Sequence, residues 1–228
     1  MAKPFSTFVQ KGYPSITLSK GTIDMQKAMN ITYEIGGKLY LNITNKCPCN
    51  CTFCIRNNGD GAYGSDPLWL EHQPTAEEVI ADLEKRDLDS YEELIFCGYG
   101  EPTCEFEILK QAAKYIRSVT KTPVRINTNG LGNLINKRDI APEFEGLLDT
   151  VSISLNAPDA QAYDAVTRPS FKGVNCFEEM LRFAAEVKKV VPNTVLTVVD
   201  VIGEEAIAKS QAVADSVGIE LRVRTYEA

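Results

Sequence analysis

Cys47-Pro48-Cys49-Asn50-Cys51-Thr52-Phe53-Cys54 is the stretch around which this chain is organised. Four of the seven cysteines of the chain lie within it. Cys47, Cys51 and Cys54 have the spacing C-x3-C-x2-C, and an aromatic residue, Phe53, directly precedes the last cysteine. Several thiols on one short loop are a typical donor set for a metal or an iron-sulfur cluster. The stretch therefore predicts a metal centre.

The number of ligands favours an iron-sulfur cluster over zinc. Three thiolates can bind three irons of a four-iron cluster and leave the fourth iron open to a reactant. Cys51-x2-Cys54 is also half of a zinc knuckle, but such a site needs a second pair of Cys or His ligands, and His72 is the single histidine. A disulfide is the weakest alternative because the loops are short and nothing indicates secretion. Cys49 is an extra thiol that could compete as a ligand with Cys47 or Cys51.

Composition limits the class of protein. A chain of 228 residues, 44% hydrophobic and 24% charged, can bury one sizeable core. A net charge of -7 and a pI near 4.9 argue against general nucleic-acid binding. With no apolar run of about 18 residues and no export signal, we expect no membrane insertion. The free cysteines predict a reducing cytoplasm, where a cluster survives best under anaerobic conditions.

Strand and helix patterns alternate on the C-terminal side of the cysteine stretch. A hairpin with a Gly36-Gly37 turn precedes it, and its second arm is the first strand of the alternation. Thr75-Ala-Glu-Glu78 is a capping box that predicts a helix start. We expect strands at 38–43, 93–97, 124–127, 150–155, 194–199 and 220–224, and helices starting near 75, 105, 175 and 204, with a helical stretch within 140–148.

Six strand-helix units predict an α/β fold with a parallel sheet and right-handed crossovers. A complete eight-unit barrel typically takes about 250 residues, so we expect a partial (β/α)6 TIM-like barrel over residues 31–228. Residues 1–30 show no sustained periodicity and are expected to be a short N-terminal extension. Polar and glycine-rich segments follow all six strands: 47–54, 98–102, 127–130, 154–156, 200–203 and 225–227. The C-terminal ends of parallel strands share one face, so these segments should meet around one site.

The cysteine stretch resembles the signature of the radical S-adenosylmethionine (radical SAM) superfamily. Leu-Tyr-Leu-Asn-Ile-Thr-Asn before it, residues 39–45, and Cys-Ile-Arg-Asn-Asn after it, residues 54–58, are similar to the TatD-associated radical SAM proteins. The resemblance covers about residues 31–228 and is closest in the cysteine loop. It implies a partial barrel, a 4Fe-4S cluster bound by Cys47, Cys51 and Cys54, and S-adenosyl-L-methionine (SAM) on the open iron.

The resemblance also implies which residues contact SAM. Gly98-Tyr-Gly-Glu-Pro is similar to the family's glycine-rich motif: the Gly98 and Gly100 backbone and the Glu101 carboxylate would receive the methionine amino group. Phe53 would lie beside the adenine. An ordinary turn at 98–102 and core filling by Phe53 remain the alternatives.

Further contacts follow the later strands. Asn127, Ser154 and Asn156 stand where family members offer polar groups to the cofactor, although plain turn formation is an alternative for Ser154 and Asn156. Arg168 would pair with the methionine carboxylate, unless it forms a surface salt bridge. Val201 lies near an apolar adenine contact, but the glycine expected before it is replaced by Val199. Cys97 and Cys176 are expected to be buried small hydrophobes.

The implied activity is reductive cleavage of SAM to a 5′-deoxyadenosyl radical that abstracts a hydrogen atom from a substrate. Such an enzyme needs an electron donor such as flavodoxin or ferredoxin. Its substrate is a small molecule or a peptide or protein, and the catalytic residues toward it are unknown. Two alternatives stay open: an activase that installs a radical on a partner protein, and a non-catalytic iron-sulfur or zinc binding module.

Overall fold

A computed structural model describes residues 26–62 and 64–225 of the chain. Most of the predicted N-terminal extension and residues 226–227 of the last strand-end segment lie outside the described residues. Residues 26–30 of the extension are described. Within them, the Ala28 backbone N–H donates to the Trp69 carbonyl at 2.8 Å. No helix in the described part of the chain has both the length and the apolar character needed to cross a membrane.

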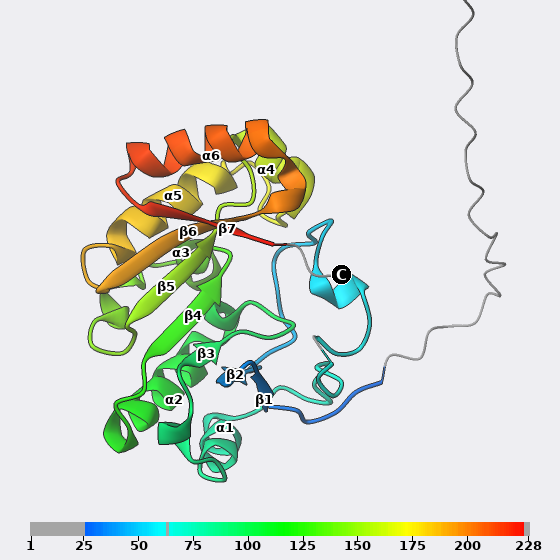
Figure 1. Cartoon of the computed structure of the whole chain (residues 1–228), viewed down its shortest axis with the longest axis vertical. Coiled ribbons are helices and arrows are strands. Elements are labelled where there is room, and N and C mark those ends of the chain that lie inside the picture. The colour runs from blue at the N-terminus through cyan, green and yellow to red at the C-terminus, as the bar shows by residue number, and fades with distance from the viewer. Residues whose placement is uncertain (1–25, 63, 226–228) are drawn as a thin grey trace, which may run out of the picture.

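One sheet of seven strands organises the fold (Figure 1). Its strands follow sequence order, the first pair is antiparallel and every later pair is parallel. The sheet is open, because the first and last strands do not pair with each other. This confirms the predicted α/β partial barrel. The strands are β1 (Thr32–Ile35), β2 (Lys38–Leu41), β3 (Leu94–Phe96), β4 (Val124–Thr128), β5 (Thr150–Ser154), β6 (Asn193–Val199) and β7 (Glu220–Arg224).

The hairpin β1–β2 is the one antiparallel connection among the described strands. Gly36 and Gly37 both have positive φ, 56° and 76°, which suits a two-residue hairpin turn and which glycine adopts without strain. The turn pairs Ile35 with Lys38 and Thr32 with Leu41. The hairpin therefore delivers the end of β2 to the cysteine stretch, as predicted.

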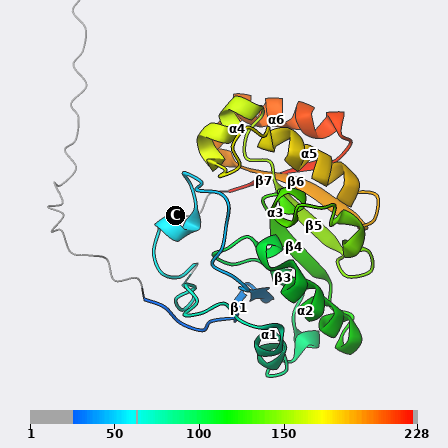
Figure 2. The same ribbon diagram turned by 180° about the vertical axis from the view of Figure 1, so that it is seen from behind.

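Helices connect the parallel strands and cover one face of the sheet (Figures 1 and 2). Alternate strand residues such as Leu41, Phe96 and Ile126 pack with apolar helix residues in one large core. The helices are α1 (Ala76–Leu83), α2 (Phe106–Val119), α3 (Gly132–Asn136), α4 (Ala160–Thr167), α5 (Cys176–Val187) and α6 (Glu204–Ser216). Short 3-10 helices lie at Ile55–Asn57, Leu88–Ser90, Pro102–Glu105, Ala141–Phe144 and Asp200–Ile202.

Side-chain caps explain where three of these helices begin. The predicted capping box is present at α1, where Thr75 accepts from the Glu78 backbone N–H and the Glu78 carboxylate accepts from the Thr75 N–H. Asn175 caps α5 by accepting from the Glu178 N–H. The sequence patterns did not predict α3 or α4. Asp159 caps α4 in the same way, accepting from the Ala162 N–H at 2.9 Å.

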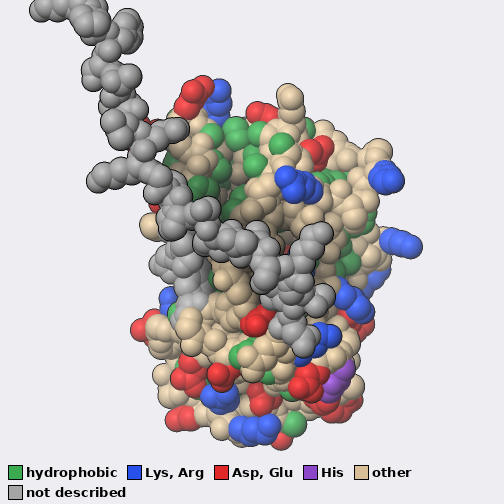
Figure 3. Space-filling model, turned by 90° about the vertical axis from the view of Figure 1, so that its right-hand side faces the viewer, with side chains coloured by type: hydrophobic (Ala, Val, Ile, Leu, Met, Phe, Trp, Pro, Cys, Tyr) green, Lys and Arg blue, Asp and Glu red, His purple; other side chains and the backbone are tan. Residues whose placement is uncertain are grey.

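One side of the molecule carries both signs of charge. Figure 3 shows the side of the molecule that lies on the right in Figure 1, where basic side chains are scattered and acidic side chains stand among them. Figure 1 shows the cysteine loop, in cyan, near the end toward which β7 points. The loop thus lies at the edge of the sheet where the parallel strands end.

Candidate functional site

The cysteine loop is fastened to the end of α4 by backbone contacts. The backbone N–H groups of Asn50 and Thr52 donate to the carbonyls of Thr167 and Val166 at 3.0 and 2.9 Å. In the other direction, the Ser170 N–H donates to the Pro48 carbonyl at 2.9 Å. Helix α4, which the sequence patterns did not predict, is therefore part of the site, because its last residues anchor the loop.

The same contacts bring Arg168 beside the cysteine loop. Arg168 ends α4 in the left-handed region with φ 46°, and its side chain is exposed. Its neighbour Pro169 forms an isolated bridge with Cys49. The structure thus places an exposed guanidinium next to the predicted cluster ligands. The methionine carboxylate of SAM is expected to pair with it there.

The thiols of Cys47, Cys49 and Cys51 lie together. Cys49 is 4% exposed, and its thiol is within hydrogen-bonding reach of both neighbours. These hydrogen bonds lower the pKa of Cys47 and Cys51, and they raise the pKa of Cys49, which burial raises further. The central thiol therefore holds its proton while the outer two are favoured as thiolates, the form that binds metal. Cys47 and Cys51 stay predicted ligands, and Cys49 is their hydrogen-bonded neighbour.

Cys54 lies beside Arg56. Its sulfur accepts a hydrogen bond from Arg56 Nε at 3.3 Å. In the described residues, no three His, Cys, Asp or Glu side chains converge on a point that could hold one metal ion. A zinc ion needs four donors around a single point, whereas each thiolate of a four-iron cluster binds a different iron. Three thiols on one loop are the donor set that a four-iron cluster with one open iron needs.

Arg56 is a site residue that the sequence patterns did not single out. Besides Cys54, its guanidinium donates to the carbonyls of Cys49 and Asn45 at 3.4 and 3.5 Å and lies 5.7 Å from the ring centroid of Trp69. It joins both ends of the cysteine loop and holds a positive charge beside the thiols. The sequence signal that could have identified Arg56 is its position two residues after Cys54, the last predicted ligand.

The two glycines of the predicted SAM motif lie against the segment that leads into the cysteine loop. A Cβ at Gly98 would stand 2.2 Å from Asn42 Oδ1, and one at Gly100 would stand 2.2 Å from the Thr44 carbonyl oxygen. Neither position has room for a side chain. The close approach seen here is between two segments of the chain, and contact of these glycines with SAM stays a prediction.

Glu101 joins the loops that follow β3 and β4. Its carboxylate is buried, 4% exposed, and Oε1 accepts from the hydroxyls of Thr103 and Thr128, each at 2.7 Å. Oε2 accepts from the Asn129 backbone N–H at 2.7 Å. Burial raises the pKa of Glu101, and these hydrogen bonds oppose that rise. The predicted contact with the SAM amino group is untested, and the structure shows a carboxylate that already has protein partners.

Two asparagines at the end of β4 face the cysteines. Asn129 Nδ2 lies 3.7 Å from the sulfur of Cys49. Asn127 hydrogen-bonds the Cys97 thiol, and its Oδ1 atom is buried without a hydrogen-bond partner among the described residues. An unpaired buried acceptor is costly, so Asn127 fits its predicted role as a contact to a ligand.

The remaining predicted contacts lie at the ends of their strands. Ser154 is half-buried at the end of β5, and Asn156 is buried with φ 62°, a left-handed conformation that asparagine tolerates. Val201 is 55% exposed on the 3-10 helix after β6, and Phe53 is half-buried on the cysteine loop. An exposed valine and an incompletely buried phenylalanine leave apolar surface for an adenine, and their contact with SAM stays a prediction.

The other cysteines divide as follows. Cys176 is buried in the core, as expected. Cys97 is half-buried instead of buried, because it stands at the end of β3 on the sheet face that no helix covers. Cys104 lies near Cys47 and Glu101, and burial together with these negative charges raises its pKa to about 12. Cys104 is therefore a neutral thiol beside the site.

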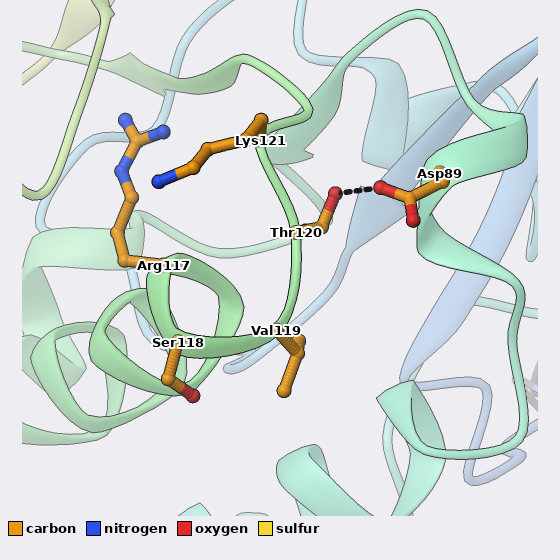
Figure 4. A pocket seen from close by; sticks show the side chains of 6 residues that line it. All are labelled: Asp89, Arg117, Ser118, Val119, Thr120 and Lys121. Carbon is orange, nitrogen blue, oxygen red and sulfur yellow. Dashed lines mark hydrogen bonds between the residues drawn. The ribbon is translucent and has the colours of Figure 1, made fainter.

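A hollow of about 230 Å³ lies at the opposite end of the strands (Figure 4). It is lined by Asp89 and by residues 117–121, between the end of α2 and the start of β4. Of the two cations that line the hollow, Arg117 and Lys121, Arg117 pairs with Asp149 at 2.7 Å. None of the predicted site residues lines this hollow, so the strand-end face remains the candidate site.

Comparison with known proteins gives a consistent result. A model of the radical SAM superfamily matches residues 41–209. GTP 3',8-cyclase of Rhodococcus opacus (strain B4) is 26% identical over 171 residues, covering 71% of this chain and 45% of the relative. GTP 3',8-cyclase of Corynebacterium glutamicum is 32% identical over 146 residues, covering 59% of this chain and 35% of the relative. The chain spans less than half the length of these relatives.

Two solved structures share the fold. Streptococcus suis SuiB bound to the precursor peptide SuiA has a TM-score of 0.61 at 17% identity, covering 84% of this chain and 39% of that one. HydG, a maturase of the FeFe hydrogenase, has a TM-score of 0.53 at 15% identity, covering 84% of this chain and 42% of that one. At these identities the likeness concerns the fold alone.

Proposed function

Because the chain belongs to the radical SAM superfamily, we propose that Cys47, Cys51 and Cys54 hold a 4Fe-4S cluster whose open iron binds SAM. Members of this family use that cluster and SAM. When bound, the pair would supply a 5′-deoxyadenosyl radical that abstracts a hydrogen atom from a substrate. The observation that carries the proposal is the three-cysteine loop, held at the strand-end face by α4 and by Arg56.

The residues of this chain would position and shield the cofactor. Arg168 offers a guanidinium for the methionine carboxylate, a geometry suited to two parallel hydrogen bonds. Gly98, Gly100 and Glu101 shape the loop on which the amino group would rest, and Asn127, Ser154 and Asn156 supply polar groups around it. Phe53 and Val201 supply apolar surface for the adenine. Arg56 offsets the negative charge that three thiolates bring to the loop.

Within the superfamily, we propose that the chain is one of the TatD-associated radical SAM proteins. It is supported by the residues on both sides of the cysteine stretch, 39–45 and 54–58. We further propose that the protein works in an anaerobic cytoplasm, since seven cysteines without disulfides among the described residues suit a reducing compartment. A flavodoxin or ferredoxin would donate the electron. The substrate is a small molecule or a peptide: the relatives are named for GTP, and one structural neighbour is bound to a precursor peptide.

A series of cysteine variants tests the cluster ligands. After anaerobic reconstitution, C47A, C51A and C54A should each lose most of the bound iron and form no 5′-deoxyadenosine from SAM under reducing conditions, because a cluster with two thiolates is poorly held. C49A is the matched control, since it removes a thiol from the same loop and should keep both iron and SAM cleavage.

Two outcomes would contradict this ligand set. Cleavage retained in C51A would remove that residue from the site. Loss of iron in C49A with retention in C54A would move the cluster onto the three thiols that lie together in the structure. Iron or zinc bound by the wild-type protein without SAM cleavage would instead support a non-catalytic binding module.

A further inference from the structure

The face of the sheet opposite the helices carries charged and polar side chains. We call it the inner face. Side chains alternate along a strand, and Leu39, Leu41, Val124, Ile126 and Leu221 belong to or pack on the helix-side core. Their sequence neighbours therefore point to the inner face. On the strands these are Lys38, Tyr40, Arg125, Asn127, Glu220, Arg222 and Arg224. Glu93 directly precedes β3, and Cys97 directly follows it.

Arg125 is the central cation of the inner face. Its side chain is 15% exposed, and one of its guanidinium nitrogens, NH2, pairs with Glu93 Oε2 at 2.9 Å. Its Nε atom is buried and has no hydrogen-bond partner among the described residues. Arginine presents its donors as a planar fork that matches the two oxygens of a carboxylate or phosphate. Within the part of the chain that the structure describes, the Nε donor of that fork is thus enclosed and unpaired, and it has a hydrogen bond left to make.

Other groups of the inner face surround the same space. In the sheet register, Arg125 stands next to Ile95, which in turn stands next to Tyr40. Burial raises the pKa of Tyr40 and of Cys97, and the positive charges of Arg125 and Arg224 oppose both shifts. The charge of Arg224 on β7 thus acts on the same two groups as that of Arg125, although β3, β4, β5 and β6 lie between β7 and the strand that carries Tyr40, β2.

The charge of this face is opposite to that of the whole molecule. The chain has a net charge of -7, but the inner-face strands bring Arg125, Arg222 and Arg224 together with Lys38. Two carboxylates share this face with the four cations: Glu93, which is paired with Arg125, and Glu220, which lies in register with Asn127 across β5 and β6. A local cationic surface in an acidic protein attracts an anionic ligand.

We propose that the inner face binds an oxyanion group, a carboxylate or a phosphate, of a small-molecule substrate, with Arg125 as its anchor. Arg224, at the end of β7, would add a second positive charge. This inference rests on the proposed function, since it assigns a substrate class to the face beside the cysteine loop. It adds that the substrate is recognised by its negative charge.

Calorimetric titration of the reconstituted full chain tests this proposal. SAM is present in excess, so that its own carboxylate is not the anion observed. Pyrophosphate and GTP probe a phosphate, and citrate and glutamate probe a carboxylate. We expect one of these two classes to bind, and its affinity to fall at least tenfold in R125Q and less in R125K. R117Q is the control, because it removes a paired arginine at the opposite end of the strands.

The double variant R125Q/E93Q separates binding from folding. It removes both members of the ion pair and leaves no unpaired carboxylate, so it should fold and still lose affinity at least tenfold. No binding by any of the four probes, unchanged affinity in R125Q/E93Q, or an equal loss in R117Q would overturn the proposal. If SAM is cleaved but no anion binds, this inference alone fails. Arg125-dependent binding without SAM cleavage would leave it standing and overturn the proposed function.

Discussion

Glu101 shows how one residue can hold two strand-end loops together. Its carboxylate lies between the loops after β3 and β4 and accepts hydrogen bonds from Thr103, Thr128 and Asn129. The motif resemblance predicted a contact with SAM, whereas the structure shows that the same carboxylate positions the loop. The charged form of Glu101 is disfavoured although several donors bond to it. Removing a carboxylate from water costs more than these hydrogen bonds return.

The raised pKa of Glu101 has a consequence for stability. Burial raises this pKa above the ordinary value of 4.5. The native state therefore binds a proton that the unfolded state has released, and stability falls as pH rises from 4.5 toward the native pKa. The slope is at most about 1.4 kcal/mol per pH unit.

The variant E101Q lacks this titration. Urea titrations of the cluster-free chain give the free energy of unfolding of wild type and of E101Q. The wild-type value minus the E101Q value should decrease as pH rises through this window and then become constant. At neutral pH, E101Q should itself lose about 1–3 kcal/mol, because an amide NH2 cannot accept the bonds that a carboxylate oxygen accepts. A difference that is independent of pH, or that increases with pH, would contradict the raised pKa.

At the scale of elements, the loop after β3 and the segment after β2 are fitted to each other. Gly100 lies against the carbonyls of Thr44 and Lys46, and the Glu101 N–H donates to the Lys46 carbonyl at 2.8 Å. Lys46 directly precedes the first predicted cluster ligand, Cys47. A displacement at Gly100 would therefore be passed to the cysteine loop.

The substitution G100A tests this coupling. A Cβ 2.2 Å from the Thr44 oxygen forces the backbone apart, which should cost about 1–3 kcal/mol of stability and lower the iron bound after reconstitution. G146A is the control: it meets no atom within 4 Å but has φ 71°, so it should cost about 1–2 kcal/mol from backbone strain. Iron content in G146A should match wild type. Equal iron content in G100A would mean that the two loops are not coupled.

Most elements were predictable from local signals. Alternating apolar residues marked the strands, and the glycine pair and the Thr75 capping box marked the hairpin and α1. The two helices that were missed, α3 and α4, span only Gly132–Asn136 and Ala160–Thr167, too short for a clear helical period. The role of α4 depends on tertiary backbone contacts with the cysteine loop, which no sequence pattern contains.

The candidate site was predictable as a set of segments but not as a set of contacts. Convergence of the strand ends follows from a parallel sheet, so Asn127, Ser154 and Asn156 could be assigned to one face, and Arg168 was assigned from the family resemblance alone. The grouping of Cys49 with Cys47 and Cys51, and the hydrogen bond of Arg56 to Cys54, depend on how the loop bends. The half-buried state of Cys97 depends on which sheet face the helices leave uncovered.

At the scale of the whole molecule, the fold separates two tasks. Helices bury one face of the open sheet, and the strand-end edge carries the cysteine loop with the residues proposed to hold SAM. The inner face, with Arg125 and Arg224, is left for the substrate. The chain spans less than half the length of the curated relatives it matches, so their substrates do not transfer to it directly.

Electron paramagnetic resonance of the anaerobically reconstituted and reduced protein, recorded with and without SAM, tests the central claim most directly. A cluster held by three thiolates leaves one iron open, so adding SAM should change the ligands of that iron. We predict a four-iron signal that shifts when SAM is added and that is absent in C51A. A cluster signal that does not respond to SAM, or a protein that binds no iron, would contradict the account.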